Sequence, residues 1–339
     1  MSKISHFDEK YGKIIKLSAK FMNMSQQIFE EDYVVEKCYE RLTSSKLTPI
    51  ILIKNKIKEE MANFLRKQKF IEISPVIISP ITDPLAHPIF EGDISYYGSK
   101  YYLTRSMIFH KQMALLAFKK IFCFSPNVRL ELKEKAASGR HLVEFTQLDL
   151  EVRDASREEI MKLGERLVIH VLTKVKKDCK KELELLGQSL HIPSPPFKRI
   201  KFEEAYSKYG ERYEDILSRK EKEPFWIVDF PIWKREFYDR EYEDKEGFLA
   251  DMDLIYPEGY GEALSGGERE YEYEKIIERM EKSGVDIKKF SFYLEMVKKG
   301  LHPSAGFGIG LERLVKFICG LSDIQCAILF PKIPGECCI

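Results

Sequence analysis

Apolar residues at helical spacing predict helices in the first seventy residues. Residues 1–50 hold one glycine and one proline, and their apolar positions recur at helical intervals, which predicts a helical arm. Because the arm has so few turn formers, we do not expect a five-stranded β-barrel within it. Over residues 54–69 the apolar side chains fall at i, i+4, i+7 and i+8: Ile57, Met61, Phe64 and Leu65. This spacing predicts an amphipathic helix with a wide apolar stripe.

A strand and a loop are expected next. The β-branched run over residues 70–78 predicts a strand. Residues 79–93 contain the breakers Pro80, Pro84, Pro88 and Gly92, and therefore predict a loop. Long loops beside a core often move or bind ligands.

Period-two alternation predicts a β-hairpin over residues 122–132 and 142–152. On its second strand Leu148, Leu150 and Val152 would face the core. The opposite face then carries a mixed set: Phe145, Gln147, Asp149 and Glu151. That face is either an ordinary solvated surface or a binding surface.

The second half of the chain predicts further helices and strands. Residues 157–187 read as a helix, and the charged, aromatic segment 197–245 reads as a covering insertion with a strand. Residues 249–256 predict a strand that carries Asp251 and Asp253 on one face. Two aligned carboxylates repel each other unless a cation or a base lies between them.

Glycine occupies every second position from Gly306 to Gly310. On a strand this spacing strips one face of side chains, so a flat ligand can lie against it. The spacing differs from the dinucleotide-binding fingerprint. Together the elements predict an α+β fold with a mostly antiparallel sheet flanked by helices.

The composition is that of a folded protein, and its net charge gives no general attraction to polyanions such as nucleic acids. Of 339 residues, 44% are hydrophobic and 32% are charged, which excludes a disordered chain. The net charge of +1 gives no global positive field, so any contact with RNA would be local. The sequence shows neither a signal peptide nor a membrane-spanning apolar run, so we expect a cytoplasmic protein without a membrane partner.

The seven cysteines are scattered without C-x-x-C spacing, which argues against a zinc site and a disulfide framework. We expect inert thiols. The adjacent Cys337 and Cys338 leave a redox role of the tail as the alternative.

Two cassettes carry a family resemblance. One is Gly306–Arg313, and the other combines Arg129-Leu130-Glu131 with a run in the predicted hairpin: Arg140-His141-Leu142-Val143-Glu144-Phe145-Thr146-Gln147-Leu148-Asp149-Leu150-Glu151. They resemble motifs 3 and 2 of the class II aminoacyl-tRNA synthetases, in the aspartyl/asparaginyl branch. The helix at 54–69 resembles motif 1, the dimer-forming element, and its apolar stripe also favours a homodimer.

The resemblance covers about residues 50–334. It gives three parts: a helical arm at 1–49, a catalytic domain at 50–334 and a tail at 335–339.

The resemblance implies an ATP site that uses Mg²⁺. Arg129 would bridge the α-phosphate and the substrate carboxylate, and Phe145 and Arg313 would hold the two faces of adenine. Arg313 would also reach the γ-phosphate. Asp253 and Glu262 would hold Mg²⁺. Further ATP contacts are implied for Glu131, Arg140, His141, Glu262 and Gly310.

The resemblance also implies an amino-acid site. Arg269 matches the arginine that reads the carboxylate of aspartate, which implies an anionic substrate group. The substrate-binding set comprises Arg105, Lys111, Gln147, Ser265, Arg269 and Ser304.

Several positions depart from the synthetase pattern on the amino-acid side. Arg105 and Ile108 replace two glutamines, Ser304 replaces a histidine, and Thr82-Asp83-Pro84 replaces glutamate-glycine-glycine. The ATP half therefore matches the pattern and the amino-acid half is rebuilt. The arm also stands where the family carries an OB-fold anticodon domain, and Arg129 and Arg140 are three residues further apart than in the family.

This combination resembles the archaeal asparagine synthetase related to asparaginyl-tRNA synthetase. It implies that aspartate is adenylated and that ammonia displaces AMP to give asparagine, with catalytic roles for Arg129, Arg313 and Asp83. Asp83 would accept the surplus proton. A tRNA partner is not expected. The alternatives are an aspartyl- or asparaginyl-tRNA synthetase without the anticodon domain, and a non-catalytic regulatory paralogue.

Overall fold

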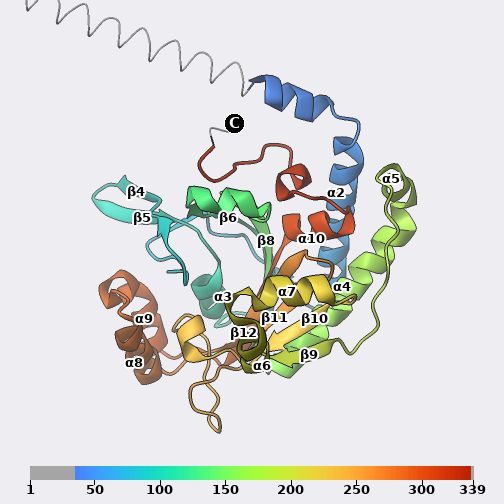
Figure 1. The fold of residues 1–339 in the computed structure, drawn as a ribbon. Coiled ribbons are helices and arrows are strands. Elements are labelled where there is room, and N and C mark those ends of the chain that lie inside the picture. The colour runs from blue at the N-terminus through green and yellow to red at the C-terminus, as the bar shows by residue number, and fades with distance from the viewer. Residues whose placement is uncertain (1–34, 337–339) are drawn as a thin grey trace, which may run out of the picture.

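One large sheet forms the centre of the molecule (Figure 1). The computed structural model describes residues 35–336, so most of the predicted arm and the Cys337–Cys338 pair lie outside the described residues. The eight strands lie in this order: β1 (Ile71–Glu72), β6 (Lys120–Val128), β8 (Glu144–Arg153), β13 (Ser304–Gly310), β12 (Gly261–Arg269), β11 (Asp251–Tyr256), β10 (Phe225–Val228) and β9 (Lys198–Lys201). The outer pairs β1–β6 and β9–β10 run parallel, and the inner neighbours run antiparallel. The predicted α+β fold is confirmed.

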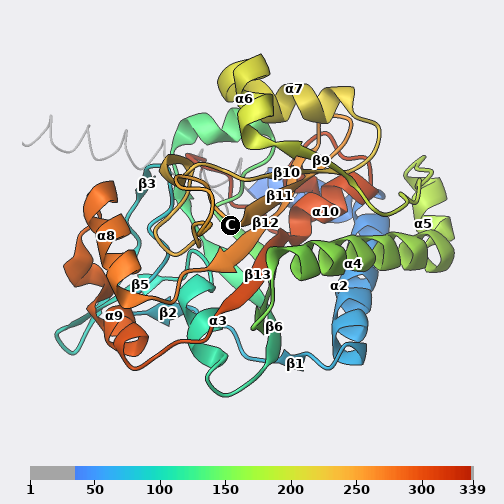
Figure 2. The same ribbon diagram turned by 90° about the horizontal axis from the view of Figure 1, so that it is seen from below.

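Three helices cover one face of this sheet. They are α2 (Leu47–Lys67), α4 (Arg157–Asp178) and α10 (Leu311–Ile318), which lie together in Figure 2. The core side chains beneath them alternate along the strands, as predicted: Leu148, Leu150, Val152, Met252, Leu254, Phe307 and Ile309. The opposite face of the sheet therefore carries the polar side chains of the same strands.

The helix predicted at 54–69 begins earlier, at Leu47, because Pro49 is tolerated within a first helical turn. Its apolar stripe does not face solvent. Ile57, Met61 and Leu65 are fully buried, and α2 packs against α4 and α10 within the chain. An exposed stripe was thus the wrong reason to expect a dimer, and the homodimer stays a prediction.

The strand predicted at 70–78 is mostly irregular. It is reduced to β1 and the start of β2 (Ile78–Ser79), because Pro75 in the middle of the run has no N–H to give to a ladder. The loop predicted at 79–93 contains β3 (Ile89–Phe90), which pairs with β7 (Leu130–Glu131). A small sheet joins β2 to the hairpin of β4 (Asp93–Tyr96) and β5 (Ser99–Leu103).

The segment 197–245 is not only a cover. Its strands β9 and β10 belong to the main sheet, and β10 is buried along its whole length beside β11. Because β10 is apolar on both faces, its pattern shows no alternation that a sequence reading could detect.

The helix predicted at 157–187 splits into α4 and α5 at Cys179. Ser156 and Glu159 form a capping box at the start of α4. The other helices are α3 (Ile108–Ala114), α5 (Lys180–Leu185), α6 (Phe202–Tyr209), α7 (Tyr213–Lys220), α8 (Tyr273–Ser283) and α9 (Ser291–Lys298).

Residues 35–43 are helical as well. Short 3₁₀ turns are η1 (Lys133–Ser138), η2 (Gly210–Arg212), η3 (Ile232–Lys234), η4 (Ile287–Phe290) and η5 (Ile324–Ala327). Within the described range, no helix has both the length and the apolar character needed to cross a membrane.

Candidate active site

A cavity of about 220 Å³ gathers the residues expected to bind ATP. It lies at the end of the sheet where Gln147 of β8 pairs with Gly310 of β13. Its lining includes the whole expected set: Arg129, Glu131, Arg140, His141, Phe145, Glu262, Gly310 and Arg313. Residues spread over almost two hundred positions thus come together because β7, β8, β12 and α10 meet there.

The alternating glycines of β13 do not leave the whole face of the strand open to a ligand, because neighbouring groups approach Gly306 closely. A Cβ at Gly306 would overlap the carbonyl oxygen of Leu150 and the carboxylate of Glu151. A Cβ at Gly310 would meet only the aliphatic part of Arg313, at 3.4 Å. Gly306 is therefore required by close approach of β8, and the strand loses its side chains where neighbouring groups fill the space.

Arg129 lies between the two halves of the site. Its guanidinium carbon is 5.2 Å from the centre of the Phe145 ring, and its Nε donates to the backbone oxygen of Arg105 at 3.1 Å. The first contact connects Arg129 to the cavity expected to hold ATP, and the second connects it to a residue expected to bind the amino acid. This position suits a cation that bridges two anions.

His87 is a site residue that the sequence reading missed. Its Nε2 lies 3.0 Å from both carboxylate oxygens of Glu131. Burial pushes the pKa of Glu131 upward, but the hydrogen bond to His87 brings it below its usual value. The pairing of β3 with β7 places His87 there, and only the prediction that loop 79–93 binds something gave a hint of it.

His141 and Arg140 have different surroundings in the cavity. Burial, aided by the charge of Arg313, lowers the pKa of His141 to about 4, so the ring is neutral at pH 7. Ser138 Oγ lies 2.7 Å from His141 Nδ1. Arg140 forms an ion pair with Glu214 of α7, which ties the cavity wall to that helix.

Arg235 separates the two aligned carboxylates of β11. Its Nε donates to Asp251 and its Nη2 donates to Asp253, both at 2.7 Å. This is the cation that the strand pattern required. Burial nevertheless raises the pKa of Asp253 to about 7, because Arg235 only partly offsets the desolvation and Glu262 lies close by.

The carboxylates of Asp253 and Glu262 are close enough to repel each other, and they are the ligand type that Mg²⁺ prefers. Their mutual repulsion would be relieved by a divalent cation. Within residues 35–336 no group of three or more potential protein ligands is present. Mg²⁺ is usually bound by one or two carboxylates together with substrate phosphates, so two are sufficient.

The amino-acid side contains a buried cluster around Glu151. Arg269, which is 4% exposed, donates from Nε to Glu151 at 3.1 Å, from Nη1 to Asp239 at 2.7 Å and from Nη2 to the Gly306 oxygen at 2.9 Å. Lys111 Nζ lies 3.0 Å from Asp149. Ser304 donates to Glu151 at 3.2 Å.

The structure thus brings together Lys111, Arg269 and Ser304, as predicted. Asp239 was missed, because the insertion that carries it gave no pattern. Gln147 and Ser265 lie on β8 and β12, and Gln147 accepts a hydrogen bond from Asn127 at 2.5 Å.

Asp83, the predicted proton acceptor, is 4% exposed and already hydrogen-bonded. Its carboxylate accepts from the Leu85 amide at 3.1 Å, from Ser106 Oγ at 2.8 Å and from the Tyr238 hydroxyl at 3.1 Å. In this arrangement Asp83 anchors the loop to its neighbours. Its role as a base stays a prediction.

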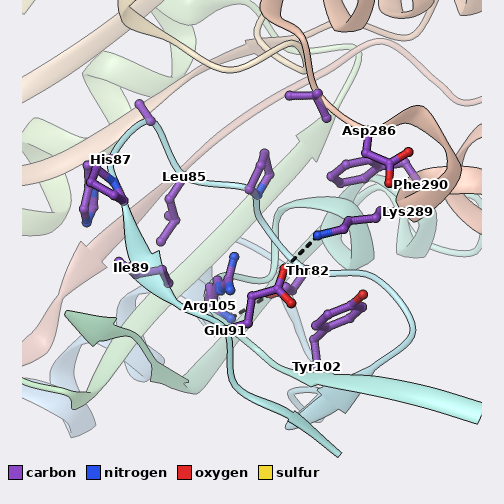
Figure 3. Close-up of a pocket in the computed structure, with 14 residues that line it drawn as sticks. Thr82, Leu85, His87, Ile89, Glu91, Tyr102, Arg105, Asp286, Lys289 and Phe290 are labelled. Atoms are coloured by element: carbon purple, nitrogen blue, oxygen red, sulfur yellow. Dashed lines mark hydrogen bonds and ion pairs between the residues drawn. The ribbon is translucent and has the colours of Figure 1, made fainter. Parts of the chain in front are cut away.

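A second cavity, of about 480 Å³, adjoins Arg105 (Figure 3). It lies between the 79–93 loop, β5 and the segment before α9, and the Glu91–Lys289 ion pair of 2.7 Å forms part of its wall. The backbone N–H of Arg105 donates to Thr82 Oγ1, and Arg105 Nη1 donates to the backbone oxygen of Asp83. Arg105 therefore stands between this cavity and the Arg129 contact.

Replacing Glu236 by glutamine is expected to stabilise the protein, and more so at higher pH. Burial, with Asp83 and Asp239 nearby, raises the pKa of Glu236 to about 8. Between its usual pKa and 8, the unfolded chain releases this proton and the folded chain keeps it, so the fold loses stability as pH rises. The gain from glutamine should grow to about 2–4 kcal/mol by pH 8.5 and be small near pH 5.

Denaturant unfolding at both pH values measures this difference. Glu281→Gln, at an exposed position on α8, is the control and should show no such trend. An equal effect of Glu236→Gln at pH 5 and 8.5 would mean that the carboxyl is not protonated in the fold.

Comparison with known proteins accounts for this arrangement. Residues 30–334 match the family model described as tRNA synthetases class II (D, K and N). The asparagine–tRNA ligase of Pelotomaculum thermopropionicum is 29% identical over 323 residues, which cover 91% of this chain and 74% of that protein. The asparagine–tRNA ligase of Thermococcus gammatolerans is 30% identical over 322 residues, which cover 90% and 74%.

A solved structure shows the same fold. Asparaginyl-tRNA synthetase from Pyrococcus horikoshii, complexed with asparaginyl-adenylate, aligns with a TM-score of 0.82 at 28% identity, over 90% of this chain and 73% of that one. The residues matched by the family model, 30–334, include the strands of the sheet, the lining of the ATP cavity and the buried cluster around Glu151. The chain belongs to the class II tRNA synthetases, in the aspartyl/asparaginyl branch.

Proposed function

We propose that the chain uses ATP to activate an amino acid of the aspartate–asparagine pair as an aminoacyl-adenylate and transfers the aminoacyl group to tRNA. The observation that carries this proposal is the cavity that holds every residue expected to contact ATP. The similarity to asparagine–tRNA ligases supports tRNA as the acceptor.

In the first step a carboxylate oxygen of the amino acid attacks the α-phosphorus of ATP, and the bond to pyrophosphate breaks. Arg129 would hold the two anions in line, because its fork can bind both. Phe145 would stack against adenine. Arg313 would reach the γ-phosphate. Its Nη1 donates to the backbone oxygen of Glu262 at 3.2 Å. In the second step a ribose hydroxyl of tRNA attacks the carbonyl carbon and AMP leaves.

Asp253 and Glu262 would hold Mg²⁺ against the phosphates, where the ion neutralises the charge of the leaving pyrophosphate. Asp253→Asn replaces an anionic ligand with a neutral amide, so we expect the Mg²⁺ concentration for half-maximal pyrophosphate exchange to rise about 10-fold. Titration of exchange activity with Mg²⁺ measures this. Asp244→Asn, in the 197–245 segment, is the control and should leave the midpoint unchanged; an unchanged midpoint in Asp253→Asn would remove Asp253 from the metal site.

Ammonia is the second candidate acceptor. The cavity beside Arg105 favours it, because a space of about 480 Å³ next to the amino-acid side could admit a small second substrate. Ammonia would attack the activated carbonyl, AMP would leave, and a proton would pass to a base. With aspartate activated at its side chain, the product would be asparagine.

One assay separates these candidates. ATP–pyrophosphate exchange is measured with aspartate and with asparagine, and product formation is then followed with tRNA, with ammonium and with neither. We expect exchange that depends on the amino acid and transfer of label to tRNA. Asparagine formation from aspartate and ammonium, with no transfer to tRNA, would instead establish the synthetase that makes free asparagine. Nucleotide binding without exchange would indicate a regulatory paralogue.

A further inference from the structure

The side chain of Arg269 is occupied by groups of this chain. Each of its three guanidinium nitrogens donates to an acceptor, and the Nη1 partner is the carboxylate of Asp239, which is 6% exposed. Asp239 lies thirty residues away in the chain and reaches Arg269 through the bridge between these two residues beside β12. A carboxylate therefore already stands on the arginine that was expected to read the carboxylate of the substrate.

Two other oxygens in this cluster lack a hydrogen-bond donor. Within the described residues, buried Oδ2 of Asp149 and Oε2 of Glu151 accept no hydrogen bond, although Lys111 Nζ lies 3.4 Å from the latter. Asp149 and Glu151 are 3% and 0% exposed. Buried polar atoms normally have partners, so these oxygens are free to accept hydrogen bonds from a bound group or a water.

We propose that Asp239 is a specificity-determining residue that makes this buried end of the site accept a carboxamide and reject a free carboxylate. The inference rests on the amino-acid activation proposed above. It adds which chemical group on the side chain of the substrate amino acid binds at Arg269. Asp239 acts by holding the Nη1 edge of Arg269, so an incoming carboxylate would have to displace it.

A carboxamide and a carboxylate differ in the hydrogen-bond donors and acceptors that they bring to this cluster. A carboxamide brings an oxygen that can accept from Arg269 or Lys111 and an amino group that can donate to the unpartnered oxygens of Asp149 and Glu151. A carboxylate brings acceptors only. It would face Asp149, Glu151 and Asp239 without donors, and displacing Asp239 would leave a buried charge unpaired.

An ammonium group next to a carboxylate offers the same combination of donors and acceptor. Aspartate could therefore bind in the reverse orientation, with its α-amino and α-carboxyl groups at Arg269 and its side-chain carboxylate toward ATP. The excluded arrangement is a free side-chain carboxylate at Arg269, which is the arrangement needed to activate the α-carboxylate of aspartate.

Trapping with hydroxylamine tests the proposal on the full chain. Hydroxylamine attacks the activated carbonyl, AMP leaves, and the hydroxamate records which carboxyl was activated. With ATP and Mg²⁺ we expect asparagine to give its α-hydroxamate with a kcat/KM at least about 100-fold above that for the α-hydroxamate of aspartate. The β-hydroxamate of aspartate would also support the proposal, because it places the ammonium group at Arg269.

Asp239→Ser shortens the side chain and frees the Nη1 edge of Arg269, and Asp239→Asn removes the negative charge that a substrate carboxylate would have to displace. Either variant should lower the preference for asparagine over α-activated aspartate by at least about 10-fold, with the KM for ATP little changed. Asp229→Asn is the matched control, because Asp229 lies in the same insertion as Asp239 and its carboxylate pairs with a different arginine, Arg157 of α4. This control should keep the wild-type preference. A preference ratio is insensitive to a general loss of folded protein, which thermal melting reports separately.

The outcomes separate this proposal from the proposed function. Efficient α-hydroxamate formation from aspartate by the wild-type chain, at a kcat/KM equal to or above that for asparagine, would overturn it. So would an unchanged preference in both Asp239 variants with folded protein. No hydroxamate and no pyrophosphate exchange with either amino acid would overturn the proposed function itself.

Discussion

Arg129→Ala is expected to abolish adenylate formation, with a loss of about 10³-fold or more in kcat/KM for pyrophosphate exchange. The reaction brings the anionic carboxylate of the amino acid against the anionic α-phosphate of ATP. Arg129 is placed between the cavity at Phe145 and the backbone of Arg105, so its loss removes the cation from the line of attack. ATP–pyrophosphate exchange at saturating amino acid measures the effect.

Arg129→Lys should recover little of this activity. Lysine keeps the charge, but it lacks the planar fork that can bind two anions and stack on the Phe145 ring. Arg166→Ala, on the exposed side of α4, is the control and should retain wild-type exchange. Wild-type exchange by the lysine variant would show that charge alone is needed and that the two-anion geometry is not.

Gly306→Ala is expected to lower the free energy of unfolding by about 3 kcal/mol or more. Its Cβ would overlap the carbonyl oxygen of Leu150 and the carboxylate of Glu151 on the paired strand β8. Backbone atoms of a central strand pair cannot move aside without disturbing the sheet. Denaturant unfolding measures the loss, and any folded variant should also show a weakened site because Glu151 holds Arg269 and Ser304.

Gly310→Ala is the matched control for folding, because Gly310 lies on the same strand and belongs to the same series of alternating glycines. There the added methyl would meet the flexible side chain of Arg313 at an ordinary contact distance of 3.4 Å. We expect its free energy of unfolding to stay within about 1 kcal/mol of the wild type. Equal losses in the two variants would mean that glycine is needed for backbone conformation rather than for close approach.

Local pattern was sufficient for the strands that alternate, whereas the residues of the ATP cavity were expected from the family resemblance of two motifs. Leu148, Leu150 and Val152 are buried as their period-two spacing predicts. The ATP residues come from the segment around β7 and β8, from β12 and from the glycine run that leads into α10, and the docking of these elements brings them together. The wholly apolar β10 shows the limit of this approach, because without alternation its place inside the sheet was not visible.

Contacts between distant segments were decided only by the tertiary structure. His87 meets Glu131 because β3 pairs with β7, and Arg235 lies between Asp251 and Asp253 because the insertion folds back onto β11.

The sequence by itself determined the fold class and the glycine-stripped strand, because these follow from periodicity and spacing along the chain. The family resemblance of its motifs named the residues that line the ATP cavity. The tertiary structure alone decided that the stripe of α2 is buried within the chain, that Asp83 is held by its neighbours and that Asp239 occupies Arg269. The physical reason is that the partner of a buried charge is chosen by which elements dock together. Arg269 finds Glu151 across 118 positions of sequence, and no local pattern records that choice.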